Sequence, residues 1–458
     1  MYFNTLEYFA FFLLVYALAR FGSKYGLQGI ILFGASAVFY AVAGLFDSVL
    51  IASLIAVNWL FIKFIRVDRI RITLSVVVNI GALAFIKYRA FFAGASIADG
   101  TAYIDTVLPL GISFYTFQLL AFQIDAKDDP RLKDCKGLIF PLFVGFFPQL
   151  IAGPIVRAKE LFNQLRNILA GRPRKLRLVS FGLGLCLLGL TKKVFLADSL
   201  SPIVDDLFFL ESPTTFEAWL GAWLFTFQIY FDFSGYSDIA LGCAYLLGVR
   251  LPWNFRTPYM SISPREFWQR WHITLSTWIR DYLYIPLGGN KGGVPRQIAT
   301  LLLVMGLAGL WHGADHTFII WGLGWGAYIA VARLFGRLGL PETTKYLWPF
   351  CWTAHILLVV VLWVFFRAPN LEVAGNFLHA MFVNIGYDQP GNGLMIVLGC
   401  AALMLLHVAE ARLLQTKAQI LRLRRFNTPF AYGLLIGLCL WLVMLPSYDV
   451  SPFIYFRF

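Results

Sequence analysis

The stretch Leu310-Trp311-His312-Gly313-Ala314-Asp315-His316 interrupts two apolar segments, 301–310 and 317–332, which together read as a membrane hairpin. The hairpin predicts helices that cross a bilayer, and its turn places two histidines and a carboxylate where lipid-facing sequence is expected. An ionisable group at membrane depth costs free energy unless it faces a cavity, a partner or a substrate. We therefore expect His312 to lie near the centre of the function of this protein.

The composition of the whole chain agrees with this interpretation. Of its 458 residues, 59% are hydrophobic and 14% are charged, far below the roughly 25% charged residues of a soluble domain. Since one span needs about 20 residues, we predict an all-α polytopic protein with roughly 11 or 12 transmembrane helices in a single domain, residues 1–458. The apolar windows are Phe9–Leu18, Gly29–Phe46, Val49–Ile65, Ile72–Ile86, Leu178–Leu196, Trp219–Phe231, Leu301–Leu310, Thr317–Ala332, Ile356–Phe366, Leu394–His407 and Ala431–Leu445.

The net charge of +13 follows from clusters of Lys and Arg between the apolar windows. Such clusters mark cytoplasmic loops, so nucleic acid is not the expected partner. With these loops inside, the His312 turn and the C-terminal tail 446–458 are predicted to lie outside. Lys87 and Arg89 are exceptions, because they follow the predicted outer end of the helix that begins at Ile72. The basic clusters are Arg20 and Lys24, Lys63–Arg71, Arg157–Arg177, Arg250–Arg296, Arg333 and Arg337, and Arg412–Arg425.

Two segments differ from ordinary spans. Residues 138–156 are apolar but rich in proline and glycine, and charged loops of cytoplasmic type lie on both sides. We predict a re-entrant segment buried in protein, and the alternative is an ordinary kinked span with one reversed loop. Residues 230–296 mix aromatic residues, glycines, prolines and charges, which predicts short helices in a vestibule that faces the cytoplasm.

Several residues are candidates for chemistry. A desolvated His312 imidazole is suited to act as a general base. His312 and His316 are four residues apart and loosely match an inverted zinc-protease pattern, but no third ligand is well placed and the six cysteines are scattered singly, so we predict no metal site. His272 lies in an amphipathic stretch, where a lone histidine is usually structural.

Each of two further stretches has two possible interpretations from the sequence. The polar stretch Tyr230–Asp238 lies at the predicted inner end of a span, where Ser and Asp either cap the next helix or act directly in catalysis. The tail Phe453–Phe458 presents Tyr455 in an aromatic setting. This phenol is either an interfacial anchor or a nucleophile.

Four strings in this order resemble the membrane-bound O-acyltransferase family. The resemblance covers nearly the whole chain and is closest to the bacterial branch that contains the alginate O-acetyltransferase membrane component and the D-alanine exporter of teichoic acid. The segments Asn254-Phe255-Arg256-Thr257-Pro258-Tyr259 and Asn290-Lys291 favour the alginate type. The four strings are Tyr230–Asp238, Trp268–Trp278, Asp281–Gly289 and Leu310–Gly313.

The resemblance implies helices around a central tunnel, with a cytoplasmic funnel for a thioester donor. It assigns catalysis to His312, the donor side to His272 and supporting roles to Asp238 and Asn254. The aromatic tail resembles one in which a tyrosine receives the acyl group, here Tyr455. The residue before the last Phe is Arg457, where the family usually has an acidic or amide residue.

The expected function is therefore O-acylation of a surface polysaccharide by a multi-pass protein of the bacterial inner membrane, an environment of lipid. The donor is a thioester such as acetyl-CoA, with no bound cofactor, and the acyl group passes to a periplasmic partner resembling SGNH hydrolases. The polymer is an alginate-like exopolysaccharide, acetylated cellulose or peptidoglycan. A polytopic transporter and an intramembrane metalloprotease are the alternatives.

Overall fold

The computed structural model describes residues 2–92, 108–135, 137–150, 153–172, 179–337, 348–384, 393–414 and 428–445. Regular structure in these ranges is helical, which confirms the all-α prediction. The helices are α1 (Leu6–Gly22), η1 (Ser23–Tyr25), α2 (Gln28–Ala43), α3 (Leu45–Phe64), α4 (Asp68–Phe92), α5 (Ile112–Asp125), α6 (Pro130–Lys133), α7 (Ile139–Gly145), α8 (Phe147–Leu150), α9 (Ala158–Leu169), α10 (Val179–Leu190), η4 (Thr191–Ala197), α11 (Asp198–Phe208), α12 (Thr215–Leu246), η5 (Pro258–Met260), α13 (Pro264–Arg270), α14 (Ile273–Ile279), η6 (Arg280–Tyr284), α15 (Val294–His312), α16 (His316–Arg337), α17 (Trp348–Arg367), α18 (Leu371–Val383), α19 (Gly393–Leu414) and α21 (Pro429–Met444).

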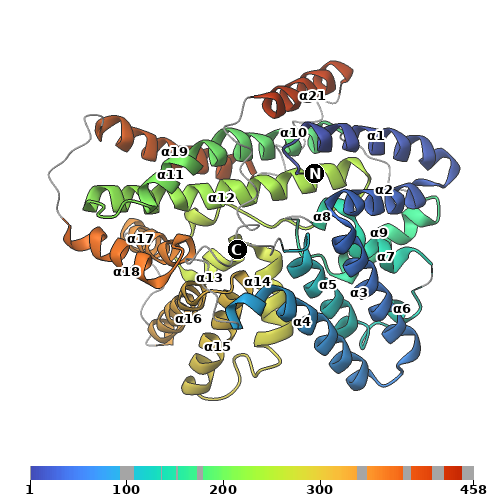
Figure 1. Cartoon of the computed structure of the whole chain (residues 1–458), viewed down its shortest axis with the longest axis horizontal. Helices are drawn as coiled ribbons and strands as arrows, with labels where there is room; N and C mark the ends of the chain where they lie inside the picture. Colours follow the sequence, from blue (N-terminus) through green and yellow to red (C-terminus); the bar gives the residue numbers. More distant parts are fainter. Residues whose placement is uncertain are drawn as a thin grey trace.

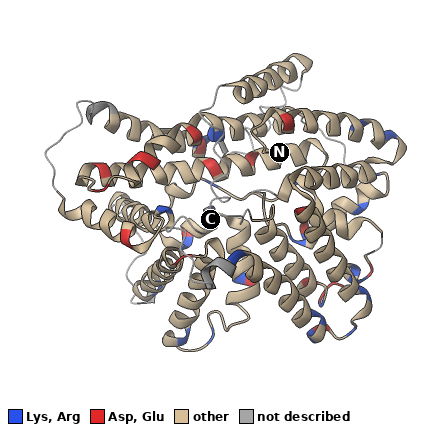
Figure 2. Cartoon of the chain, in the orientation of Figure 1, with Lys and Arg blue, Asp and Glu red and all other residues tan. Residues whose placement is uncertain are grey.

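The chain is a multi-pass membrane protein. Within the described ranges, seven helical stretches are long and apolar enough to cross a bilayer, and α2, α18 and α21 are shorter apolar helices. Figure 2 shows that charged residues are sparse along most helices, with many Lys and Arg at the lower and right-hand margins and several Asp and Glu within the upper helices. The seven stretches are Leu6–Tyr25, Leu45–Phe64, Asp68–Tyr88, Val179–Phe208, Val294–His312, His316–Gly336 and Trp348–Arg367.

The long helix α12 crosses the molecule beside α10 and α11 (Figure 1). The prediction that this span ends near Phe231 is wrong, because the helix continues unbroken to Leu246. Tyr230–Asp238 therefore lies inside a 32-residue helix, and the interpretation of its Ser and Asp as caps of a following helix is wrong as well. The short helices predicted for 230–296 begin only after Leu246.

The prediction that the span Leu178–Leu196 ends at Leu196 is also wrong. A π-helical turn, η4, joins α10 to α11, so that helix continues to Phe208. The turn contains Lys192 and Lys193, and both side chains are buried. Lys193 lies 2.7 Å from Asp198 and 2.6 Å from Asp232. Asp198, just beyond the predicted end of the span, is thus an interior ion-pair partner.

The hairpin that decides the fold is confirmed as α15 and α16. Its two helices approach closely because glycines face each other: a Cβ on Gly309 would lie 2.1 Å from the Phe318 carbonyl oxygen, as small residues allow in membrane helix pairs. The helix breaks between His312 and His316, so the two histidines do not share one helical face. The Phe318 ring fills the space beside Gly313, where a Cβ would lie 2.1 Å from it.

Residues 138–150 have the broken backbone that was predicted for this part of the segment 138–156. Two short helices, α7 and α8, are separated by Phe146 and consist almost wholly of buried residues. At 1.5 Å per residue, neither helix can span a bilayer of about 30 Å. The position of this segment relative to a membrane stays a prediction.

Contacts between helix ends agree with the predicted threading. Asp47, expected outside, accepts a hydrogen bond of 3.2 Å from the Leu110 N–H, which precedes α5. On the side expected to face the cytoplasm, Lys133 pairs with Asp68 at 2.9 Å. Arg71 differs from the predicted loop residue, because it is only 1% exposed and donates to Gln123 inside the helix bundle.

Candidate active site around Trp311

His272 lies at the break between α13 and α14, deep in the protein. It is fully buried and precedes α14 with left-handed dihedral angles, φ 40° and ψ 54°. Among the described residues, only Thr257 and His272 combine a side chain with positive φ. Such a conformation costs about 1–3 kcal/mol and persists where the surroundings enforce it. The backbone here is therefore set by tertiary contacts, and not by the preference of histidine.

Asn254 supplies those contacts. Its backbone carbonyl accepts from the Ile273 N–H at 2.9 Å, and its side-chain oxygen accepts from the Thr274 N–H and hydroxyl at 3.3 and 2.9 Å. The same oxygen lies 3.1 Å from Nδ1 of His272. Since a backbone N–H fixes this atom as the acceptor, Nδ1 of His272 carries the proton and Nε2 presents a lone pair.

Nε2 of His272 has no hydrogen-bond partner among the described residues, although it is buried. His272 lies outside the candidate membrane-spanning helices, and its burial lowers the pKa of the imidazole to about 3. The ring is therefore neutral at physiological pH. A neutral imidazole with a free lone pair in a dry setting is equipped to accept a hydrogen bond or a proton from a ligand.

His312 is the last residue of α15 and is 4% exposed. Its ring centroid lies 5.1 Å from that of Trp321, almost perpendicular to it, and 5.2 Å from that of Phe366. These rings come from α16 and α17, so three helices enclose the imidazole. A histidine held among aromatic rings, with little water around it, is suited to proton transfer.

The indole of Trp311 lies between the two histidines. Its centroid is 6.4 Å from that of His272 and 4.8 Å from that of His312. The ring of Phe117 stacks on this indole at 5.1 Å, and Trp278 stacks on Phe117 at 4.0 Å. Two histidines that are 40 positions apart in the sequence thus meet one aromatic stack, as expected if both face one reaction path.

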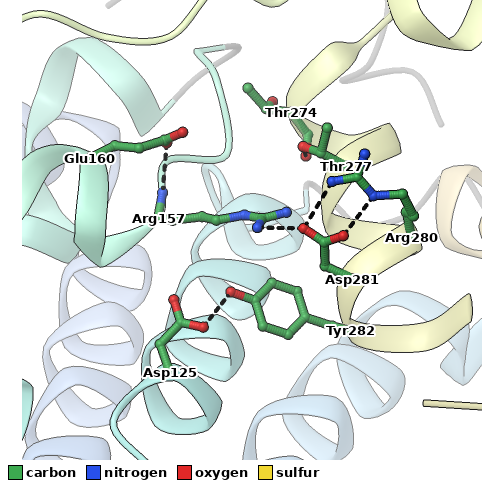
Figure 3. A network of polar contacts seen from close by, with 8 residues as sticks. All are labelled: Asp125, Arg157, Glu160, Thr274, Thr277, Arg280, Asp281 and Tyr282. Atoms are coloured by element: carbon green, nitrogen blue, oxygen red, sulfur yellow. Dashed lines mark hydrogen bonds and ion pairs between the residues drawn. The ribbon is translucent and has the colours of Figure 1, made fainter. Parts of the chain in front are cut away.

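A polar network lies where α9, α5 and η6 meet (Figure 3). Arg157 pairs with Asp281 at 2.6 Å, and its guanidinium lies 5.1 Å from the Tyr282 ring centroid. Tyr282 donates to Asp125 at 2.7 Å, and Arg280 also binds Asp281. Two guanidinium groups thus share the carboxylate of Asp281, and Arg280 is the more exposed of the two, so it is the more accessible to an anion.

Asp238 lies elsewhere, in a buried ion-pair cluster. Lys192 contacts Asp238 at 2.6 Å and Glu410 at 2.5 Å. Tyr230 donates to Glu410 at 2.8 Å, and His407 lies 3.5 Å from the same carboxylate. The two predicted supporting residues are therefore in different places. Asn254 contacts His272, whereas Asp238 belongs to a cluster that joins η4, α12 and α19.

No role for Lys192, Glu410 or Lys87 was predicted from the sequence. The sequence does mark these three residues as unusual, because each is a charged residue within or beside an apolar segment. It does not reveal their partners, which lie far away in the sequence. Tyr455 and the tail 446–458 lie outside the described residues. Within those residues, no group of three His, Cys, Asp or Glu side chains could hold a metal ion.

Comparison with known proteins adds independent evidence on the family. Residues 138–373 match the model of MBOAT, the membrane-bound O-acyltransferase family. The chain is 42% identical over 375 residues to the probable alginate O-acetylase of Azotobacter vinelandii, which covers 78% of this chain and 72% of that protein. It is 35% identical over 345 residues to the peptidoglycan O-acetyltransferase of Helicobacter pylori, covering 68% and 64%. It is 27% identical over 265 residues to the teichoic acid D-alanyltransferase of Bacillus subtilis, covering 55% and 65%.

Proposed function

Because the chain belongs to the membrane-bound O-acyltransferase family and is an O-acyltransferase, we propose that it O-acetylates a surface polysaccharide. The donor is a cytoplasmic thioester such as acetyl-CoA, and the acyl group crosses the bacterial inner membrane through this protein. Relatives named for alginate and peptidoglycan support a polysaccharide target. The comparisons lend no support to a transporter or a metalloprotease.

One observation carries the proposal: His272 and His312 contact the same indole, Trp311, from separate segments. His272 precedes α14, next to the short helices of the predicted vestibule, whereas His312 ends α15 at the turn predicted to face outward. A thioester that enters from the cytoplasm would pass His272 and bring its carbonyl to His312. The acceptor would approach His312 from the other side.

The proposed chemical step uses His312 as the base and the Tyr455 phenol as the acceptor. The imidazole takes the phenol proton as the phenol oxygen attacks the thioester carbonyl. The carbon–sulfur bond breaks, and the departing thiolate takes the proton from the imidazolium. The products are an acyl-tyrosine ester, a free thiol and a neutral His312. A serine of a periplasmic partner resembling SGNH hydrolases then accepts the acyl group and passes it to the polymer.

The donor needs cations for its phosphates, and the predicted vestibule supplies them. Arg280 has a side chain that is 59% exposed, and Lys291 and Arg296 are exposed as well. Arg157 lies deeper and shares Asp281 with Arg280. We assign phosphate contact to the exposed residues and orientation of η6 to the Arg157–Asp281 pair.

The acyl-tyrosine intermediate provides the test of the proposal. Membranes that contain the full chain are incubated with isotopically labelled acetyl-CoA, and Tyr455 is examined by mass spectrometry. We expect an acetyl group on Tyr455 and expect Tyr455→Phe to abolish O-acetylation of the polymer. Tyr16→Phe, which keeps a ring in α1, serves as the matched control and is expected to behave as the parent. Normal polymer acetylation by Tyr455→Phe would refute the relay.

A second prediction concerns the support of His272 by Asn254. Asn254→Ala removes the acceptor of three hydrogen bonds, including that to Nδ1 of His272. Since an unpaired buried group costs about 1–3 kcal/mol, we expect acyl transfer to fall by about 10-fold or more. Acyl transfer is measured as the rate of CoA release by purified protein in proteoliposomes.

Asn254→Asp keeps the acceptor oxygens and is expected to retain more activity than Asn254→Ala. Asn167→Ala, at an exposed position on α9, is the matched control. Equal rates for Asn254→Ala and Asn167→Ala would show that Asn254 does not support the site.

A further inference from the structure

Two neighbouring side chains of α4 bind the end of the helix that carries His312. Nζ of Lys87 donates to the carbonyl oxygens of Trp311 and His312 at 2.6 and 2.8 Å. The Tyr88 hydroxyl donates to the carbonyl oxygen of Leu310 at 2.6 Å. These contacts join residues that are 222 to 225 positions apart.

The contacts complete the hydrogen bonding of a helix end. The last four carbonyls of an α-helix lack partners within the helix. In α15, the Gly309 carbonyl accepts from the Gly313 N–H at 3.4 Å, and the carbonyls of the three following residues accept from Lys87 and Tyr88. The helix has no further turn to satisfy them, and little water is available at this depth. Without α4, three carbonyls would be left unpaired.

The charge of Lys87 also suits this place. The C-terminus of a helix carries partial negative charge, which a cation stabilises. In the predicted topology, Lys87 was an unexplained cation near the outer end of α4. Its position at the end of α15 gives that cation a partner and puts both helix ends on one side of the membrane, as the threading requires.

We propose that Lys87 and Tyr88 are positioning residues that hold His312 in its reactive geometry. The inference rests on the proposed function, because it assumes that His312 is the base. The His312 carbonyl that Lys87 binds belongs to the residue whose ring takes the proton, so movement of this helix end moves the imidazole. A displacement of about 1 Å in a reacting group can cost about 100-fold in rate.

Four variants test the proposal in purified full-length protein. Lys87→Met removes both hydrogen bonds and the charge, Lys87→Arg keeps a cationic donor, and Tyr88→Phe removes the third bond. Lys63→Met is the matched control, since Lys63 is an exposed lysine in the last turn of α3. Turnover and KM for acetyl-CoA are measured in proteoliposomes, per amount of folded protein.

We expect Lys87→Met to lower kcat by about 10- to 100-fold without changing KM for acetyl-CoA, because the donor contacts lie elsewhere. Lys87→Arg should restore a large part of the loss, Tyr88→Phe should lower kcat less, and Lys63→Met should match the parent. An unchanged kcat in Lys87→Met, or a loss confined to KM, would overturn the positioning role.

Hydrogen exchange separates this inference from the proposed function. The amides of the peptide that contains Gly313 should exchange about 10-fold faster or more in Lys87→Met, whatever reaction the protein performs. Faster exchange with an unchanged kcat shows that Lys87 caps the helix but does not position a base. If His312→Ala also keeps full activity, the proposed function fails with it, whereas an inactive His312→Ala confines the failure to Lys87.

Discussion

Replacement of His312 by Ala is expected to reduce acyl transfer by about 1000-fold or more. A positioned base contributes about 10²- to 10⁴-fold, and the neighbouring rings of Trp311, Trp321 and Phe366 carry no basic group that could take its place. The measurement is CoA release in proteoliposomes, together with the O-acetyl content of the polymer made by cells.

Two variants make this result specific. His312→Gln keeps most of the volume of the side chain, so a loss of activity with unchanged melting temperature excludes a folding defect. His316→Ala is the matched control, because His316 is exposed at the start of α16. We expect it to retain activity. If His316→Ala were as inactive as His312→Ala, the mechanism in which His312 alone acts as the base would be wrong. A site formed by both histidines would then have to be considered.

Replacement of Lys192 by Met is expected to give the largest loss of stability. It leaves Asp238 and Glu410 without the ammonium that both contact. Removing one partner of a buried ion pair costs about 3–5 kcal/mol, because the remaining charge is uncompensated. The expected result is a marked fall in the melting temperature of the purified protein in detergent.

Removal of the orphaned charges should restore stability. The triple variant Lys192→Met, Asp238→Asn, Glu410→Gln is expected to melt well above Lys192→Met alone, since no uncompensated charge remains. Arg131→Met, which removes one member of an exposed pair with Asp129, is the control and should leave the melting temperature unchanged. A Lys192→Met protein as stable as the parent would show that the cluster does not hold η4, α12 and α19 together.

The sequence predicted best where the signal was local. The hairpin of α15 and α16 followed from two apolar runs around one polar turn, and the broken backbone of residues 138–150 followed from its prolines. It failed where a helix continued through polar residues. Asp198, Asp232 and Asp238 read as ends of spans, but buried lysines pair with them inside continuous helices.

For the candidate site too, the sequence predicted residues in local motifs but not the contacts between distant segments. His312, His272 and Asn254 were identified from local motifs, and the structure places Asn254 against His272 and both histidines on Trp311. Roles for Lys192 and Glu410 were missed, because the contact between the two side chains depends on how η4 and α19 pack. The bounds of the vestibule and of the tail remain predictions.

By itself, the sequence determined the all-α membrane class, the turn at His312 and the family, because apolar periodicity and short motifs are properties of neighbouring residues. Only the tertiary structure decided which charges are compensated and which side chains bind the end of the helix that carries His312. Lys87 and His312 are 225 positions apart, and no local pattern records their contact. The physical reason is that a buried carbonyl or ammonium must find a partner wherever the fold provides one, at any distance along the chain.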